Sequence, residues 1–261
     1  MKRISNFTLL VSLLLSACGG IPGLNPAATP TSAPTMTSAP TLTPLPTDTP
    51  TPIPTSTPDI TATAAAKATE SSGVVLAELD KLLADTDIPF KEGHLTWQQA
   101  EPLTIELTGP ENKILAIDEN LTAANFVLKS DVIWTASGII ICGAVFRSEP
   151  DLEQGKQYQF TFLRLSGLPA WAIEVHEFGK YKNSPTDVKF SGALDQGNGT
   201  TNTFVLVAWE DQFHLYINQH REGRFFDYSK QRTEGAFAFL ALQDSGKGSC
   251  EFENSWVWAL D

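Results

Sequence analysis

The chain has 261 residues and a formal net charge of −12 at pH 7. Eleven of its 17 prolines lie between Pro22 and Pro58, so this stretch cannot join a packed core. The roughly 190 other residues are enough for one domain. A body this acidic is repelled by nucleic-acid phosphates and anionic lipid headgroups, so we expect no nucleic-acid partner. An aromatic content of 10% and abundant Val, Ile and Thr favour a β-rich fold.

Residues 1–18 have the features of an export leader. Lys2 and Arg3 form a positive n-region, and residues 7–15 form an apolar run too short to cross a bilayer. The run ends in Leu-Ser-Ala-Cys at residues 15–18, which resembles the lipobox of bacterial lipoproteins. The resemblance implies that Cys18 carries a diacylglyceryl group and becomes the mature N-terminus. The expected localisation is therefore export and lipid anchoring to the cell membrane, facing outward. An ordinary signal peptide with an unrelated cysteine is the alternative.

Residues 19–60 are predicted to form a disordered tether. Thr-Pro units recur through it, and Asp48 is the one charged residue between Ile21 and Pro58. Such a segment buries little apolar surface and stays extended and polyproline-like. At ~3.1 Å per residue it could reach on the order of 120 Å and hold a domain away from the membrane.

Residues 61–90 are predicted to form a helical segment. Its apolar residues recur at three- and four-residue steps: Val75, Leu76, Leu79, Leu82 and Leu83. This spacing predicts a helix from Thr61 to about Ala84, docked by its apolar stripe on the domain that follows. An oligomerisation helix is the alternative, and the oligomeric state stays open.

Residues 91–261 are predicted to form one β-sandwich domain. Strand signals separated by short turns fall near residues 95–98, 103–108, 114–117, 125–134, 139–147, 157–165, 171–178, 202–209, 213–217, 225–228, 236–242 and 252–260. Many short antiparallel strands with few helices predict an all-β fold, either a two-sheet sandwich or a jelly roll.

The hairpin at residues 203–218 shows the clearest alternation. Apolar residues in each arm occupy every second position, and a short polar connection at residues 210–212 joins the arms. Strict period-2 alternation predicts one buried face and one solvated face, as in an antiparallel sheet packed on a second layer.

Four segments resemble strands of concanavalin A-like lectin/glucanase domains: residues 125–134, 142–147, 213–218 and 252–258. The similarity covers roughly residues 95–260 and extends to laminin G-like domains. It also extends to the 3-keto-disaccharide hydrolase, or family 16 glycoside hydrolase-like, domains. The resemblance implies a concanavalin A-like jelly roll, and its motifs are structural rather than catalytic.

Three cysteines have to be assigned. If Cys18 takes the lipid, Cys142 and Cys250 remain as an even pair in an exported domain. In the sandwiches that this chain resembles, the strands holding these two positions can lie close together. We therefore predict a Cys142–Cys250 disulfide, with two buried thiols as the alternative.

A glycosidase needs two carboxyl groups that face one cleft, roughly 5–10 Å apart. The Glu-x-Asp-x-x-Glu strand of family 16 glucanases is absent from this chain. In the nearest pattern, Glu174 and Glu177 fall on opposite faces of a regular strand, whereas Glu174 and His176 share a face. No catalytic residue is predicted, and the sequence argues against an enzyme.

The four histidines show no paired metal-ligand spacing, so no zinc site and no cofactor are predicted. Calcium is common in sandwiches of this kind. Asp187, Asp195 and Asn198 are candidate ligands by composition alone, which leaves a structural calcium ion open and no metal-ligating residue assigned.

Sugar binding requires exposed aromatic faces beside planar polar groups. Strand parity places Trp171 in the core, and Trp256 and Trp258 are also expected there. The candidates for a solvated sheet face or its rim are Arg164, Glu174, His176, Tyr181, Tyr216 and Tyr228.

The sequence thus predicts a surface-displayed lipoprotein that carries a non-catalytic module. Its partner would be a glycan or a cell-envelope polymer, and the lipid anchor would be its only membrane contact. Two alternatives remain: a glycan-processing hydrolase of the 3-keto-disaccharide hydrolase type, and a structural or partner-binding envelope protein.

Overall fold

A computed structural model describes residues 60–165 and 167–261, so the predicted leader, Cys18 and almost the whole tether lie outside the described residues. The elements in chain order are α1 (Ile60–Leu83), the 3-10 helix η1 (Phe90–Glu92), β1 (His94–Gln98), β2 (Leu103–Thr108), β3 (Glu111–Ala116), β4 (Thr122–Ala123), β5 (Phe126–Ala136), β6 (Ile140–Ser148), β7 (Gln157–Leu165), β8 (Leu168–Glu177), β9 (Lys180–Asn183), β10 (Lys189–Phe190), β11 (Thr201–Trp209), β12 (Gln212–Ile217), β13 (His220–Phe226), β14 (Gly235–Gln243) and β15 (Lys247–Ala259).

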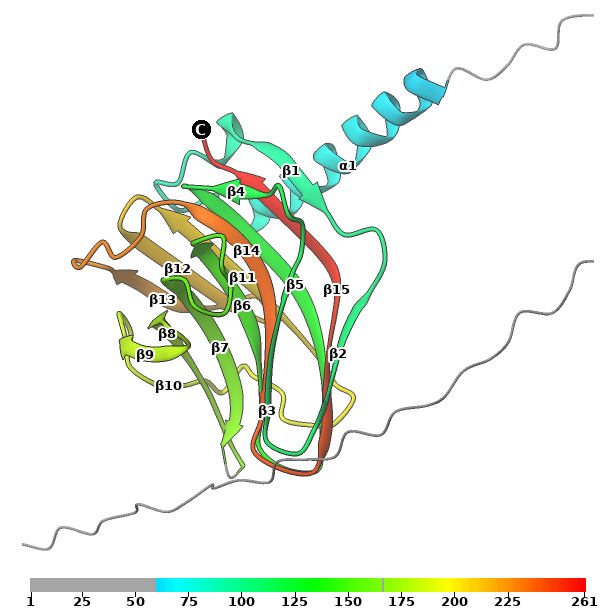
Figure 1. Cartoon of the computed structure of the whole chain (residues 1–261). Helices are drawn as coiled ribbons and strands as arrows, with labels where there is room; N and C mark the ends of the chain where they lie inside the picture. The colour runs from blue at the N-terminus through cyan, green and yellow to red at the C-terminus, as the bar shows by residue number, and fades with distance from the viewer. Residues whose placement is uncertain (1–59, 166) are drawn as a thin grey trace, which may run out of the picture. The chain divides into compact units, whose positions relative to one another are not determined.

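The strands form two antiparallel sheets (Figure 1). Sheet A has 7 strands in the order β1-β15-β5-β11-β12-β13, and β2 also pairs with β15. Sheet B has 8 strands in the order β10-β8-β7-β6-β14-β3, with β4 on β14 and β9 on β8. The two sheets curl and pack face to face, so the predicted all-β sandwich is confirmed.

Aromatic rings fill the space between the sheets. Phe126 meets Phe237 edge to face at 4.6 Å, and the Phe239 and Phe252 rings stack at 4.1 Å between centroids. Trp171 is buried, as expected. Burying large rings supplies most of the stabilisation of such a core, and each favourable ring pair adds about 0.5–1.5 kcal/mol beyond its buried area.

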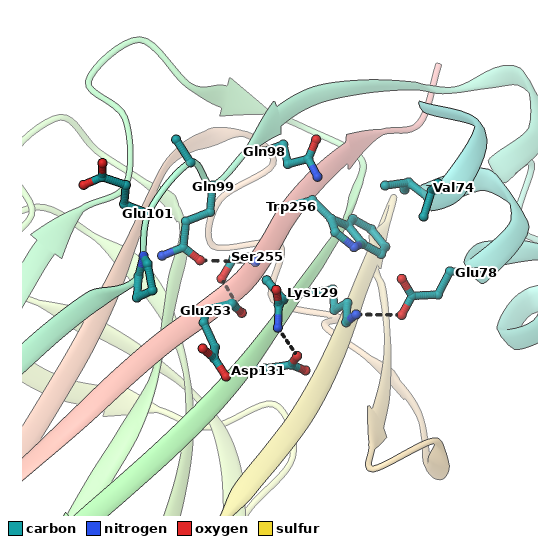
Figure 2. Close-up of a pocket in the computed structure, with 14 residues that line it drawn as sticks. Val74, Glu78, Gln98, Gln99, Glu101, Lys129, Asp131, Glu253, Ser255 and Trp256 are labelled. Atoms are coloured by element: carbon teal, nitrogen blue, oxygen red, sulfur yellow. Dashed lines mark hydrogen bonds and ion pairs between the residues drawn. The ribbon is translucent and has the colours of Figure 1, made fainter. Parts of the chain in front are cut away.

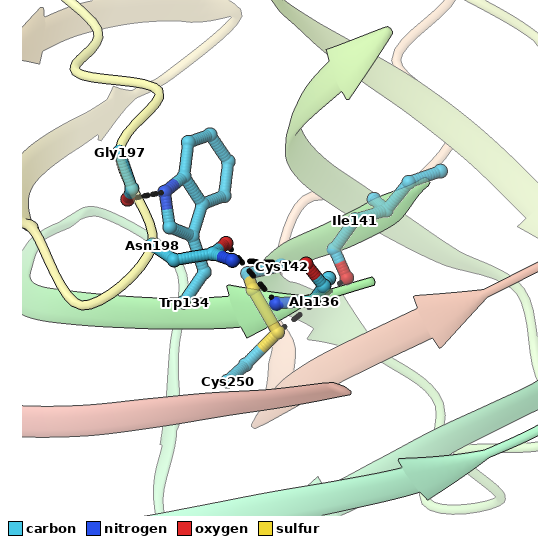
Figure 3. Close-up of a disulfide and its surroundings, with 7 residues drawn as sticks. All are labelled: Trp134, Ala136, Ile141, Cys142, Gly197, Asn198 and Cys250. Carbon is cyan, nitrogen blue, oxygen red and sulfur yellow. Dashed lines mark hydrogen bonds between the residues drawn. A yellow bond between two sulfur atoms is a disulfide. The ribbon is translucent and has the colours of Figure 1, made fainter. Parts of the chain in front are cut away.

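A disulfide joins the sheets (Figure 3). Cys142 on β6 of sheet B bonds Cys250 on β15 of sheet A, with a Cα–Cα distance of 5.8 Å across a sequence separation of 108. The predicted bridge is therefore confirmed. Beside it, the indole Nε1 of Trp134 donates to the Gly197 carbonyl at 3.0 Å, so a loop is fastened over this end of the sandwich.

Helix α1 packs on the outer face of sheet A. Its buried residues Val75, Leu79 and Leu83 join Trp256 and Trp258 in a second apolar cluster, separate from the one between the sheets. The predicted docking of the apolar stripe is thus seen within one chain. In the described part of the chain, no helix combines the length and apolar character that a membrane span requires.

This docking overturns the prediction that the 203–218 hairpin has one solvated face. Phe204 and Leu206 lie between the sheets, while Val205 and Val207 on the opposite face are buried in the cluster with α1. Alternation reports which residues share a face. It cannot report that a distant helix will cover the second face.

Two further strand predictions need correction. The strand placed near residues 225–228 runs from His220 to Phe226, so Tyr228 lies beyond its end. Its first residues are polar, and Gly223 has a φ of 153°, a backbone geometry that the sequence pattern did not show. Strands β4, β9 and β10 were missed because segments of two to four residues give no periodic signal.

Candidate functional site

The outer face of sheet B carries a polar floor. Cross-strand register pairs Gln157 with His176 and Gln159 with Glu174 on neighbouring strands β7 and β8. The alternate residues Tyr158 and Phe160 point into the core, so the two glutamines point outward. Two glutamines, a glutamate and a histidine therefore form one polar block on this face.

A groove of about 530 Å³ runs beside this block. Gln157, Gln159 and His176 line one side, and Ile114 and Leu115 of β3 line another. The groove thus combines a polar floor with an apolar wall, which is the general composition of small-molecule sites.

Three of the candidate residues, Glu174, His176 and Tyr181, lie side by side. The His176 ring nitrogen Nε2 lies 3.0 Å from a Glu174 carboxylate oxygen, which fixes the imidazole in place. The Tyr181 ring meets the His176 ring edge to face, with centroids 6.2 Å apart, and Tyr181 is 57% exposed. An aromatic face open to solvent therefore stands next to a hydrogen-bonded polar pair.

Gln157 and Gln159 are candidate site residues that the sequence analysis did not identify. Gln157 accepts a hydrogen bond from the Ser148 hydroxyl at 2.9 Å. Gln159 is only 8% exposed, and its side-chain amide makes no hydrogen bond to the described residues. Among the described residues, the fully buried side-chain atoms without a hydrogen bond belong to His214 and Gln243. The Gln159 amide instead reaches the open groove, where it can bond an incoming donor or acceptor. The alternating Gln-Tyr-Gln-Phe of residues 157–160 was the available signal.

Tyr216 is a wrong prediction. It is buried in the cluster beneath α1, and burial raises the pKa of its phenol. The strand parity that favoured a solvated position was read correctly, but α1 covers that face. Tyr216 therefore belongs to packing and not to a sugar-binding surface.

Of the predicted residues, His176 lines the groove, and Glu174 and Tyr181 contact His176 beside it. Arg164 and Tyr228 do not line it. Arg164 lies on β7, where its backbone pairs with Pro169, and its side chain is outside the described part of the chain. Tyr228 follows β13 of sheet A, is 85% exposed and stacks on Phe226 with ring centroids 5.8 Å apart.

A smaller hollow of about 360 Å³ lies between α1 and sheet A (Figure 2). Lys129 reaches the Glu78 carboxylate of α1 at 2.8 Å. Asp131 accepts hydrogen bonds from Thr203 at 2.5 Å and from Asn254 at 3.0 Å. Because these charged groups already have partners, we assign them to fastening α1 and the sheet A strands.

The calcium candidates are dispersed in hydrogen-bond roles. Asp195 accepts from the Gly197 backbone at 2.9 Å, and Asn198 bonds the backbone of Ala136. Over residues 60–165 and 167–261, no group of three or more His, Cys, Asp or Glu side chains is arranged to hold a metal ion.

Solved structures share the sandwich at low identity. The carbohydrate-binding module CBM66 from Bacillus subtilis is 15% identical with a TM-score of 0.45, over 58% of this chain and 84% of that chain. A β-glucanase from Bacillus licheniformis is 9% identical with a TM-score of 0.43, over 67% and 87%. Sheep galectin-11, solved with glycerol, is 8% identical with a TM-score of 0.38, over 58% and 98%.

No protein-family model matches the chain, and no curated protein matches it in sequence. At these identities and TM-scores, the chemistry of the groove has to be argued from its own residues.

Proposed function

We propose that this protein is a surface-displayed lipoprotein whose sandwich binds a glycan or a cell-envelope polymer in the groove on the outer face of sheet B. The observation that carries the proposal is the Gln159 amide, which is 8% exposed, opens into the groove and makes no hydrogen bond to the described residues.

The groove and the side chains that contact His176 beside it offer the groups that a sugar ring needs. Sugar hydroxyls both donate and accept, and the Gln159 amide can answer both roles. The Glu174 carboxylate adds an acceptor, and His176 beside it is held in a fixed orientation. The exposed face of Tyr181 can pack against the C–H face of a ring. Together these groups favour a neutral polyhydroxylated polymer.

Binding without hydrolysis is part of the proposal. Glycoside cleavage requires two carboxyls that flank the bond. Among the described residues that line the groove, Glu153 is the one carboxylate, and the nearby Glu174 carboxylate bonds His176. We therefore assign Glu174 to holding His176 and to accepting from a ligand.

The lipid anchor rests on residues 15–18. Metabolic labelling with an alkyne fatty acid tests it: wild type should incorporate the label and a Cys18→Ala variant should not. Label retained on the variant would contradict anchoring at Cys18, whatever the groove binds.

Affinity electrophoresis of the full-length protein in gels that contain β-glucan, mannan, levan or peptidoglycan fragments tests the groove. We expect at least one polymer to retard the protein. Gln159→Leu and Tyr181→Ala should each weaken that retardation at least tenfold, because one removes the amide and the other the stacking face.

The matched control is Glu106→Gln, which alters an exposed side chain on β2 of sheet A, and it should leave the retardation unchanged. Retardation that survives both groove variants contradicts the assignment. Turnover of any of these polymers, lost in Glu174→Gln, would replace binding by hydrolysis.

A further inference from the structure

A second hollow, of about 480 Å³, lies at one end of the sandwich. Four connections meet there: the β4–β5 link, the end of β6, the β11–β12 turn and the loop after β13. None of its lining residues lines the groove on sheet B. The hollow is therefore a separate site, and the argument for it does not rest on the proposed function.

The hollow holds the two buried charges of the described chain. Arg147 is 2% exposed and Asp227 is 3% exposed, and no other described Arg, Lys, Asp or Glu side chain is buried. Removing a charge from water is expensive unless partners replace the water, so each of these groups has to be accounted for.

Asp227 is fully satisfied by its own neighbourhood. Its carboxylate accepts from the Tyr158 hydroxyl, from the Ser229 hydroxyl and from the backbone N–H groups of Ser229 and Gln231. Burial, followed by the bond to Asp227, raises the pKa of Tyr158, which keeps the phenol protonated as a donor. Asp227 is thus the anchor of this end and has no free acceptor to offer.

Arg147 is not satisfied. Its Nε and Nη2 both donate to the Ala124 carbonyl, at 2.9 and 2.7 Å, and its guanidinium lies 5.7 Å from the Phe213 ring centroid. It forms no salt bridge, and its Nη1 has no hydrogen-bond partner among the described residues. A rigid, buried guanidinium therefore has one unused edge while it lines the hollow.

An acceptor and a second donor share the hollow with Arg147. The Asp211 carboxylate has one ion pair, with the exposed Lys230 at 3.4 Å, so it can accept further bonds. Asn125 uses its oxygen to accept from the Glu210 backbone at 2.8 Å, and its amide nitrogen makes no bond to a described residue.

The backbone around the hollow is unusual. Arg147, Glu210 and Lys230 have φ values of 49°, 53° and 44°, in the left-handed region that residues other than glycine rarely occupy. Such conformations are unfavourable and gather at ligand sites, where the surrounding fold holds them in place.

The charges select the class of ligand. Three cations and three anions line the hollow: Arg147, Lys230, Arg232, Glu210, Asp211 and Asp227. An anionic ligand therefore meets no net positive charge. A neutral ligand with adjacent hydroxyls fits better, because one hydroxyl can accept from Arg147 while its neighbour donates to Asp211.

We propose that this hollow binds a single neutral sugar ring, or a similar polyol, through the Arg147 guanidinium and the Asp211 carboxylate. Tyr228 follows Asp227 in the chain and is 85% exposed, but it does not line the hollow, so the proposal depends on Arg147 and Asp211. The protein thus has an end site in addition to the groove on sheet B.

The test is a ¹H–¹⁵N NMR titration of the full-length chain with glucose, galactose, mannose and fructose, and with glucuronate as the anionic counterpart. We expect saturable shifts from at least one neutral sugar at the Arg147 Nε signal and at the backbone amides of Asp211 and Lys230. Glucuronate should bind at least fivefold more weakly than that sugar.

Arg147 variants risk unfolding, so Asp211→Asn is the test variant, since Asp211 lines the hollow outside the buried network. It should weaken the end-site affinity at least fivefold, and Tyr228→Ala, which lies outside the lining, should not. Gln159→Leu in the groove should leave it unchanged, which separates this proposal from the groove proposal.

Three results would overturn the end site. One is the absence of saturable shifts at these signals with every neutral sugar. Another is stronger binding of glucuronate than of any neutral sugar. The third is an Asp211→Asn variant that keeps wild-type affinity.

Discussion

Both outer faces of the sandwich are formed by strands with alternating sequences, but one face is covered and the other borders an open groove. On sheet A, α1 covers Val127, Val205 and Val207, and the face becomes a second core. On sheet B no helix of the described residues covers the strands, and Gln159 and His176 line an open groove. This uncovered face is the one on which we propose that a ligand binds.

Two polar side chains that make no hydrogen bond to the described residues, His214 and Gln159, illustrate the difference between these faces. His214 on sheet A is 3% exposed and has no hydrogen bond at either ring nitrogen. Gln159 on sheet B borders the groove. The missing hydrogen bonds are a cost at the buried His214, whereas the Gln159 amide is open to the groove and can bond water or a ligand. Four predictions test this contrast.

The largest effect should come from the bond that holds the two sheets together. A double variant, Cys142→Ser with Cys250→Ser, should lose up to ~4–5 kcal/mol of unfolding free energy, because a loop of this length is no longer closed in the unfolded chain. Urea unfolding with and without reductant measures it. If reductant lowers the stability of the double variant as much as that of wild type, the effect does not come from this bond.

The packing of α1 on sheet A should contribute slightly less to the free energy of unfolding than the disulfide does. Leu79→Ala removes a fully buried side chain between α1 and the sheet and should cost about 2–5 kcal/mol. Val74→Ala on the same helix removes an exposed side chain and should change stability by less than about 0.5 kcal/mol. Equal losses in the two variants, measured by urea unfolding, would show that α1 does not form a core with sheet A.

The buried and unbonded His214 should make the free energy of unfolding depend on pH. Burial, assisted by Arg221 and Arg224 and opposed by Asp87, lowers the pKa of His214 from 6.5 to about 4. Between these values the unfolded chain binds a proton that the folded chain does not. Stability should therefore fall as pH falls from 6.5 to about 4, by up to about 1.4 kcal/mol per pH unit, and His214 should contribute nothing above that window.

Urea unfolding at several pH values across this window measures the slope, and His214→Leu should flatten it. The control is His220→Gln, since His220 is exposed at the start of β13 and should leave the slope unchanged. A slope that persists in His214→Leu would assign it to carboxylates elsewhere.

The substitution of Gln159 beside the groove should cause the smallest change in the free energy of unfolding. Gln159→Leu removes an unpartnered amide and keeps the apolar stem, so unfolding free energy should stay within about 1 kcal/mol of wild type or rise. A larger loss, by the same urea measurement, would show that the amide has a structural partner and would weaken the case for a ligand.

Strand positions were largely predictable because alternation and turn residues are local signals. The pairing of Glu174 with His176 followed from parity along β8, and the Cys142–Cys250 bridge followed from the family resemblance. The burial of Tyr216 was not predictable, since it depends on α1, more than 130 residues away in the chain. The importance of Arg147 was also hidden, because its neighbours Ala124, Asp211 and Asp227 come from three separate connections.

The two sheets are fastened differently towards the two ends of β6. Near its start the link is covalent, through Cys142; near its end it is a buried polar network of Arg147, Tyr158 and Asp227. A reducing agent attacks only the first link, and an Asp227→Asn substitution weakens only the second. The two links can therefore be removed separately, and the end of the sandwich at which unfolding begins should depend on which link has been removed.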